Sequence, residues 1–441
     1  MVFGGLVLIA IFLYVKDYKV LALIIFFFFI TSGFNLIPEE VMTNKLFSKG
    51  MDYAILIIAG MVIIDSFCIK NYLKPDKLIW LILGFYGFLA VCVIYNKLVI
   101  GTSWIEIIRT IRYNVLWIAY LVFRNLSRER LLHLLNYLFL ITVACATLYL
   151  LQIFLNETIL NETEINHVWL FRMKIPRFYN QPDMLQIFTF MAIYFNPYKG
   201  KIKIITTVIL VMALLGAFHR SLFIAFVLAI SIGYIVRLSR AKKVVVLTSF
   251  AIIGSIFIVF FGYKFIHSRT VNDIGIVLSG NAANIDASDI DIEVLQKSTF
   301  TFRIAHLLER NQYLLAHPKA MLFGAGLMTE DSKLTSLMFD FKVGLVEEML
   351  GKKAQLETAD ISYSILIMRY GYLGTLLVLS LYIFLMSYFY KNRTDPVGLF
   401  SFVYFIVVIV GSFFSYILIV PVSFLLPMIT YSVVQKNKLE I

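Results

Sequence analysis

Long apolar runs separated by short polar connections make up most of this 441-residue chain. Hydrophobic residues account for 60% of the sequence and charged residues for 15%, a balance that excludes an ordinary soluble globular domain. A helix needs about 20 apolar residues to cross a bilayer, and roughly twelve to fourteen runs approach this length. The sequence therefore predicts an all-α integral membrane protein, a polytopic bundle of about 12–14 transmembrane helices.

The apolar runs divide the chain into three parts. We expect N-terminal transmembrane helices over residues 1–262, about ten in number, with an outer loop near 156–183. A large, partly helical external loop follows over 263–359, and C-terminal transmembrane helices over 360–441. The predicted spans lie near residues 2–15, 20–37, 51–69, 78–95, 105–123, 131–155, 184–197, 204–218, 221–236, 244–262, 360–389, 397–412 and 414–434.

The net charge of +12 is distributed by loop. Lysine and arginine gather in every second connection, for example at Lys16/Lys19, Arg124/Arg128/Arg130 and Lys436/Lys438. This is the positive-inside pattern, which places those loops and the C-terminus in the cytoplasm and the large loop outside. The positive charge therefore predicts a membrane orientation and no nucleic-acid partner.

Arg220 is the charged residue whose position is most unusual. It follows Phe218 and His219 between two apolar runs, and an arginine at a bilayer boundary costs a few kcal/mol unless it meets water, a counter-ion or an anionic ligand. It is either a functional residue or an interfacial arginine whose guanidinium snorkels to water.

Other arginines fall in the predicted external segments. A guanidinium offers a planar fork of donors that suits phosphate oxygens, so a convergent set would bind a diphosphate. The external and near-external arginines are Arg172, Arg177, Arg220, Arg303 and Arg310.

Four basic residues share one face of a predicted helix in the large loop. Arg303, His306, Arg310 and His317 lie within roughly a 60° sector at 100° per residue, and Pro318 ends the helix. The stripe is either a ligand-binding surface or a solvated face.

Two further groups carry charge into or next to apolar runs. Asp360 stands where the large loop re-enters the membrane, and it would either accept a proton from a sugar hydroxyl or cap the following helix. Arg109 and Arg112 lie one turn apart in the fifth span, and we interpret them as structural, with Glu106 as partner. No phosphate-binding glycine loop and no metal-type spacing is present, so we expect neither metal nor cofactor.

Taken together, these residues resemble the bacterial O-antigen polymerase and O-antigen ligase superfamily, which includes polymerases for capsule and exopolysaccharide. Arg220-Ser221 resembles the Ser-Arg-Gly-like turn of that group. Arg303 precedes Pro318 by the family's spacing, and Gly324-Ala-Gly326 follows. The segment 177–183 is similar to the arginine and turn before the middle spans. The resemblance covers about residues 130–390.

The chain departs from the ligase pattern at one point. Ligases have a His-Asn pair at the end of the loop, and here Asp360 and Ile361 stand in those positions, while Gly371 and Gly374 keep the family spacing. This departure argues against ligase chemistry.

The resemblance implies a GT-C-like membrane glycosyltransferase of the bacterial cytoplasmic (inner) membrane. It would join undecaprenyl-diphosphate-linked oligosaccharides on the outer face, surrounded by membrane lipid and with a chain-length regulator protein as a candidate partner. Arg177, Arg220 and Arg303 would contact the diphosphates, with Arg310 and His306 as further candidates. Asp360 would orient or deprotonate the acceptor hydroxyl. The alternatives are an O-antigen ligase and a flippase or transporter of the lipid-linked oligosaccharide.

Overall fold

The computed structural model describes residues 2–43, 49–69, 72, 76–161, 166–170, 173–178, 181–217, 220–238, 299–344, 346–347, 352–356 and 361–437. The predicted span at 244–262 and Asp360 lie outside these residues, and only the backbone of Arg220 is described. The first half of the predicted large loop is likewise outside.

Helices dominate the described part of the chain. In order along the sequence they are α1 (Val2–Val15), α2 (Lys19–Ile30), α3 (Glu39–Met42), α4 (Gly50–Cys68), α5 (Lys77–Tyr95), the π-helical turn η1 (Asn96–Ile100), α6 (Trp104–Val115), the 3-10 turn η2 (Leu116–Ile118), α7 (Ala119–Phe123), α8 (Arg128–Leu155), α9 (Leu185–Phe195), α10 (Gly200–Gly216), α11 (Arg220–Arg237), α15 (Thr299–Ala316), α16 (Pro318–Phe323), α17 (Lys333–Met338), α18 (Ser362–Lys391), α19 (Pro396–Gly411) and α20 (Val422–Asn437).

Strands are confined to two short antiparallel hairpins among the described residues. β1 (Asn166–Leu170) pairs with β2 (Met173–Arg177), and β3 (Val346–Glu347) pairs with β4 (Lys352–Lys353). The fold is therefore helical, as the apolar runs predict.

Four of the described helical stretches are long and apolar enough to cross a membrane: Gly50–Cys68, Lys77–Ile100, Arg128–Leu155 and Ser362–Lys391. They contain 19, 24, 28 and 30 residues, and at about 1.5 Å per residue each approaches or exceeds the thickness of a hydrocarbon core. Shorter apolar helices accompany them. This architecture is compatible with an all-α membrane protein.

Several predicted spans end earlier or break where polar groups compete for the backbone. The span predicted over 20–37 stops at Ile30, where the Thr31 hydroxyl donates to Phe27 O at 2.9 Å and the chain turns through left-handed conformations at Phe34 and Asn35. The span predicted over 105–123 is divided into α6, η2 and α7. The last helix begins at Val422 and not at 414.

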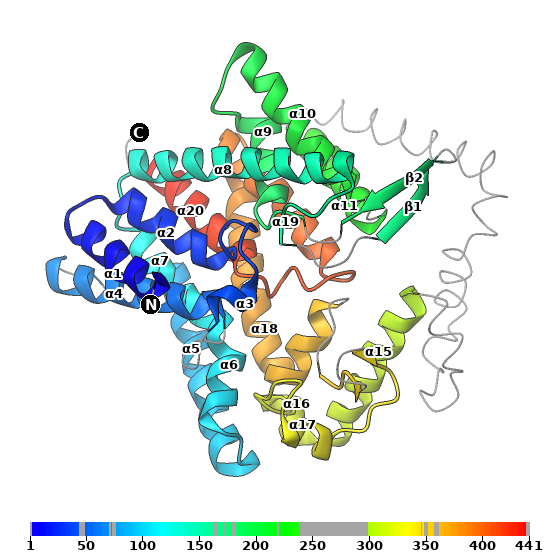
Figure 1. Ribbon diagram of the computed structural model, residues 1–441. Helices are drawn as coiled ribbons and strands as arrows, with labels where there is room; N and C mark the ends of the chain where they lie inside the picture. Colours follow the sequence, from blue (N-terminus) through cyan, green and yellow to red (C-terminus); the bar gives the residue numbers. More distant parts are fainter. Residues whose placement is uncertain are drawn as a thin grey trace.

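The described elements form two parts joined by α18 (Figure 1). We call α15, α16, α17 and residues 339–356 the loop module, and α1 to α11 with α19 and α20 the helical bundle. In Figure 1 the loop module lies beside the lower ends of α5 and α6 and below the rest of the bundle, and α18 (orange) runs from the module into the bundle.

Two glycines allow the loop module to contact α18 at backbone distance. Gly371 interrupts α18 with φ +63°, and a Cβ there would lie 2.6 Å from Met321 O of α16. A Cβ at Gly324 would lie 2.2 Å from Arg369 O. The Ala325 N–H donates to Met368 O at 2.7 Å, so these glycines fix the loop module to the kink in α18.

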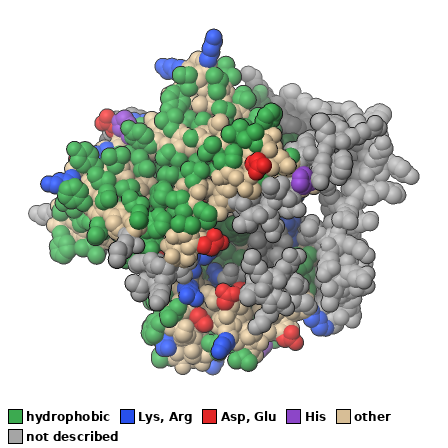
Figure 2. Space-filling view, in the orientation of Figure 1, with side chains coloured by type: hydrophobic (Ala, Val, Ile, Leu, Met, Phe, Trp, Pro, Cys, Tyr) green, Lys and Arg blue, Asp and Glu red, His purple; other side chains and the backbone are tan. Residues whose placement is uncertain are grey.

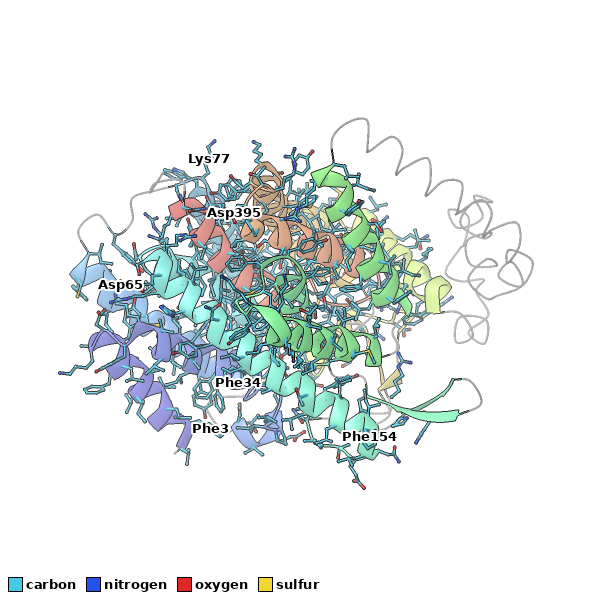
Figure 3. All side chains as sticks on the ribbon, turned by 90° about the horizontal axis from the view of Figure 1, so that it is seen from above. Phe3, Phe34, Asp65, Lys77, Phe154 and Asp395 are labelled. Carbon is cyan, nitrogen blue, oxygen red and sulfur yellow. The ribbon has the colours of Figure 1, made fainter. Side chains whose placement is uncertain are left out.

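Seen from above in Figure 3, Lys77 and Asp395 lie near the upper edge of the molecule, Asp65 lies at its left, and Phe3, Phe34 and Phe154 lie in its lower part. Their position relative to a membrane stays a prediction.

Candidate functional site

The loop module packs on α5 and η1, where the Leu327 N–H donates to Asn96 Oδ1 at 2.6 Å, and Figure 2 shows a hollow between another part of the module and the bundle above it. The bundle surface above it is mainly apolar, whereas acidic and basic side chains gather around the hollow and on the loop module below. We call this hollow the cleft. We group with it the charged and aromatic residues that ion pairs, a cation–π contact and electrostatic interactions link to one another in this region: Glu39, Lys49, Asp52, Arg112, Tyr113, Asp183, Arg303, Glu330, Arg369, Phe414 and Tyr416.

Two ion pairs form the bundle side of the cleft. Lys49 Nζ lies 3.5 Å from Glu39 Oε2, and Arg112 Nη1 lies 3.4 Å from Asp52 Oδ2. Burial lowers the pKa of Lys49, but Tyr113 and Glu39 outweigh this effect and leave the pKa above its usual value. Lys49 is therefore a cation at neutral pH.

The partner of Arg112 differs from the one that the sequence suggested. We expected Glu106, one turn earlier on the same helix, but the described ion pair joins α6 to Asp52 of α4. Arg112 is 7% exposed, and a buried guanidinium needs a counter-charge more than an exposed one does. The pairing between helices explains why the arginine is tolerated there.

The turn between α19 and α20 places two aromatic rings at the cleft. The guanidinium of Arg303 lies over the Phe414 ring, with Cζ 5.6 Å from the ring centroid. Tyr416 is 49% exposed and lies within electrostatic reach of Asp183, Lys49 and Glu39. Tyr416 is therefore an exposed ring near two carboxylates, whereas Phe414 is half-buried and lies against a guanidinium.

Hydrogen bonds hold this turn in place. The Ser362 N–H donates to Ser412 O and Ser415 O, each at 3.1 Å, and the Ser362 hydroxyl donates to Ser415 O at 2.7 Å. The Leu418 N–H donates back to the Ser362 hydroxyl at 3.2 Å. The start of α18 therefore determines where Phe414 and Tyr416 lie.

Arg303 is the described member of the basic stripe that faces the cleft. Its side chain is half-buried and contacts the bundle through Phe414, although it belongs to α15 of the loop module. This position lets one arginine connect the two parts.

Arg310, two turns further along α15, is fully buried inside the loop module. Its guanidinium donates to Gln355 O at 2.8 Å and to Val343 O, and it pairs with Glu309 at 2.7 Å. Its Cζ lies 4.3 Å from the centroid of the Phe341 ring. Burial lowers the pKa of Arg310 to about 10, which leaves it charged at neutral pH.

His306 is also fully buried, and its Nδ1 lies 2.8 Å from Ser364 Oγ. Burial, with a smaller effect from the charge of Arg310, lowers the pKa of His306 to about 2, so the ring is neutral at physiological pH. His317 is exposed at the end of the helix, where its ring stacks on Tyr313. Buried and engaged in this way, His306 and Arg310 are poorly placed to contact a diphosphate.

Arg177 is the last residue of β2, and its side chain lies next to the end of α10. Its Nε donates to Ala217 O at 3.0 Å, and Ala217 is the residue that ends α10. Helix α11 begins at Arg220. The backbone of Arg220 and the side chain of Arg177 are thus brought to one end of the α10–α11 pair, at the bundle and not on the loop module.

Asp183 is a cleft residue that sequence patterns did not single out, although it belongs to the segment 177–183. Its side chain is exposed to solvent, yet protein atoms surround it on most sides, because it lies in a recess. This desolvation raises the pKa of Asp183 to about 6; a hydrogen bond with Asn35 opposes the shift, and the charge of Glu39 adds to it. Its position follows from the turn after Pro182, which sequence patterns do not place in space.

Arg369 lies two residues before the kink of α18 at Gly371, and it is 6% exposed. It lies within electrostatic reach of Tyr113, Glu330 and Arg112. It also lines a small internal cavity with Tyr113 and Asn114 that has room for roughly one water molecule. No group of three or more His, Cys, Asp or Glu side chains able to hold a metal ion occurs within the described ranges.

Comparison with known proteins leaves the family of this chain open. A scan against models of protein families finds none that matches. A search of curated proteins finds no matching relative. The likeness to the polymerase and ligase superfamily therefore rests on the motifs quoted above.

Proposed function

We propose that this protein is a polysaccharide polymerase, a membrane glycosyltransferase that joins undecaprenyl-diphosphate-linked oligosaccharide repeat units on the outer face of the bacterial cytoplasmic membrane. The observation that carries the proposal is the cleft, where Arg303 of the loop module lies over Phe414 of the bundle, and where Tyr416, two residues further on, lies within electrostatic reach of Asp183 and Glu39. Cations suit the diphosphate, and rings with carboxylates suit the sugars.

In the proposed reaction, a hydroxyl of the acceptor repeat unit attacks the anomeric carbon of the donor chain. The bond between that carbon and the diphosphate oxygen breaks, and undecaprenyl diphosphate leaves with the electron pair. Negative charge develops on the leaving group, and preorganised cations at that point lower the barrier most. We assign this role to Arg303, Arg177 and Arg220.

Candidate diphosphate-binding arginines on both parts of the molecule fit a reaction with two lipid-linked substrates. Arg303 lies on α15, and Arg177 and the start of α11 lie on the bundle. We assign one diphosphate to each side. Asp360 would orient or deprotonate the acceptor hydroxyl, as the resemblance implies. The GT-C-like architecture and the external position of the loop module belong to the same proposal.

The test is an electrophoretic analysis of surface glycan from a strain that lacks the gene, complemented with wild type, Asp360→Ala or Asp340→Ala. We expect the empty strain to lose the long ladder and keep single-repeat glycan, wild type to restore the ladder, and Asp360→Ala to fail. Asp340 is an exposed carboxylate of the loop module, so its variant should restore the ladder and serves as the matched control.

Other glycan patterns would contradict the polymerase function. Accumulation of undecaprenyl-linked polymer in the empty strain would identify a ligase. Repeat units retained on the inner face would identify a flippase. An unchanged ladder in the empty strain would exclude all three functions.

A further inference from the structure

Asp183 occupies a fixed position at the edge of the cleft. The Asp183 N–H donates to Asn35 Oδ1 at 3.1 Å, and the Asn161 N–H donates to Asn35 O at 2.8 Å. The Leu185 N–H donates to Pro182 O at 2.9 Å, which closes the turn that carries Asp183 into α9. These hydrogen bonds hold the backbone of Asp183, and of the Asn35 segment to which it is bonded, in one position.

Groups from three other elements face Asp183. Glu39 of α3 and Tyr416 of the α19–α20 turn lie within electrostatic reach, and so does Cys145 of α8, whose thiol donates to Phe34 O at 3.3 Å. Asn35 supplies a side-chain hydrogen bond. The side chain of Asp183 itself is exposed, so a substrate hydroxyl has access to it.

We infer that Asp183 is the carboxylate that takes the proton from the acceptor hydroxyl, an inference that rests on the proposed polymerase function. The hydroxyl oxygen forms the new bond to the anomeric carbon, the bond from that carbon to the diphosphate breaks, and the hydroxyl proton moves to a carboxylate oxygen of Asp183. No further reactant is needed. Asp360 then orients the acceptor and does not carry the proton.

The surroundings of Asp183 give it the acid–base properties that this role requires. A general base works best when its pKa lies near the working pH, because it is then ionised before the reaction and still able to hold the proton afterwards. The recess and the charge of Glu39 raise the pKa of Asp183 to about 6, whereas an ordinary aspartate stays near 4. Tyr416, next to it, offers a ring on which the acceptor sugar can stack.

The test is a pH profile of polymerisation by the full-length protein in lipid nanodiscs. The probe is the lipid-linked single repeat unit extracted from the strain that lacks the gene. For wild type we expect the initial rate to fall as the pH is lowered through about 6, because protonated Asp183 cannot accept the proton. Asp183→Asn should lose at least about 100-fold in rate, and Asp360→Asn should keep the acidic limb of the profile at its wild-type pH.

Glu39→Gln supplies a readout that a purely structural aspartate would not give. Removing this neighbouring negative charge lowers the pKa of Asp183, so the acidic limb should move to lower pH. Glu40→Gln, which changes the next carboxylate of the same short helix, is the matched control and should leave the limb in place.

The outcomes separate the two levels of the proposal. If wild type makes no polymer from the probe, the polymerase function fails and this inference with it. If wild type makes polymer but Asp183→Asn keeps its rate, or Glu39→Gln leaves the limb unmoved, only the role of Asp183 is overturned. The Glu39→Gln profile decides the matter even where Asp183→Asn does not fold, because that variant retains Asp183.

Discussion

The interior of the loop module and the cleft each contain an arginine of α15, but the two arginines differ in burial and in the groups they contact. In the interior, Arg310 is fully buried and donates to backbone carbonyls on two segments, near residues 343 and 355. In the cleft, Arg303 is half-buried and lies against an aromatic ring of the other part of the molecule. Both arginines belong to one face of α15.

The difference shows that a shared helix face does not imply a shared role. Glu309 accepts from the Lys342 and Val343 N–H groups at 2.6 and 3.1 Å, so Glu309 and Arg310 together hold the chain that returns toward α18. Arg303 lies two turns earlier on the helix, and its guanidinium lies over the Phe414 ring of the bundle. Depth in the module separates the two arginines, and the helical period alone cannot show depth.

The largest effect that tests this comparison is a loss of stability on substitution of Arg310. Arg310→Ala should lower the free energy of unfolding by about 3–5 kcal/mol, because it leaves buried carbonyls and Glu309 without their partner. Thermal unfolding of the detergent-solubilised protein measures it. Arg303→Ala, two turns away, is the matched control and should unfold close to the wild-type temperature. Equal losses in both variants would contradict the distinction.

The next effect concerns activity at Arg303. Arg303→Ala and Arg220→Ala should each reduce polymer by about 100- to 1,000-fold while the protein stays in the membrane, since each removes a donor from a developing charge. Arg303→Lys keeps the charge but loses the planar fork, so it should restore activity only in part. Densitometry of the glycan ladder against protein level gives the measurement. Normal polymer length in both alanine variants would exclude the diphosphate site.

The smallest effect is a pH dependence of stability at His306. The pKa of His306 is about 2 in the folded protein and near 6.5 when unfolded, so the unfolded state binds the proton first and stability is lost as the pH falls below about 6.5. The slope is at most about 1.4 kcal/mol per pH unit. His306→Asn should lose less stability than wild type between pH 7.5 and about 5.5.

The exposed His317 provides the control for this measurement. His317→Asn, at the end of the same helix, should keep the wild-type loss of stability on acidification. A His306→Asn variant with the same acid sensitivity as wild type would mean that His306 is accessible to protons in the folded protein.

Some features of the fold could be predicted because they depend on local sequence. The helices at Val2–Val15, Gly50–Cys68 and Leu185–Phe195 begin and end within two residues of the predicted spans, since an apolar run records both the helix and its length. The end of α2 at Ile30 was missed, because apolar residues resume at Phe34, Leu36 and Ile37. The turn depends on the Thr31 hydroxyl and on contacts of Asn35.

The candidate site was only partly visible in the sequence. Arg303 and Arg177 could be singled out because they are arginines of predicted external segments, and a guanidinium suits phosphate oxygens. Lys49 and Asp183 lie in polar turns where charged residues are common, so nothing in their local pattern distinguished them. What distinguishes them is their electrostatic interaction with Glu39 and Tyr416, which come from segments far apart in the chain.

By itself, the sequence determined the helical character of this protein, the order of its long apolar helices and the cations that need a special environment. Each of these follows from properties of neighbouring residues, namely hydrophobic length and charge. The tertiary structure decided which of the basic residues on α15 is buried and which faces the cleft, and it placed Asp183 in a recess beside Glu39. Burial and electrostatic surroundings depend on the packing of distant segments, and for that reason only the folded chain could assign them.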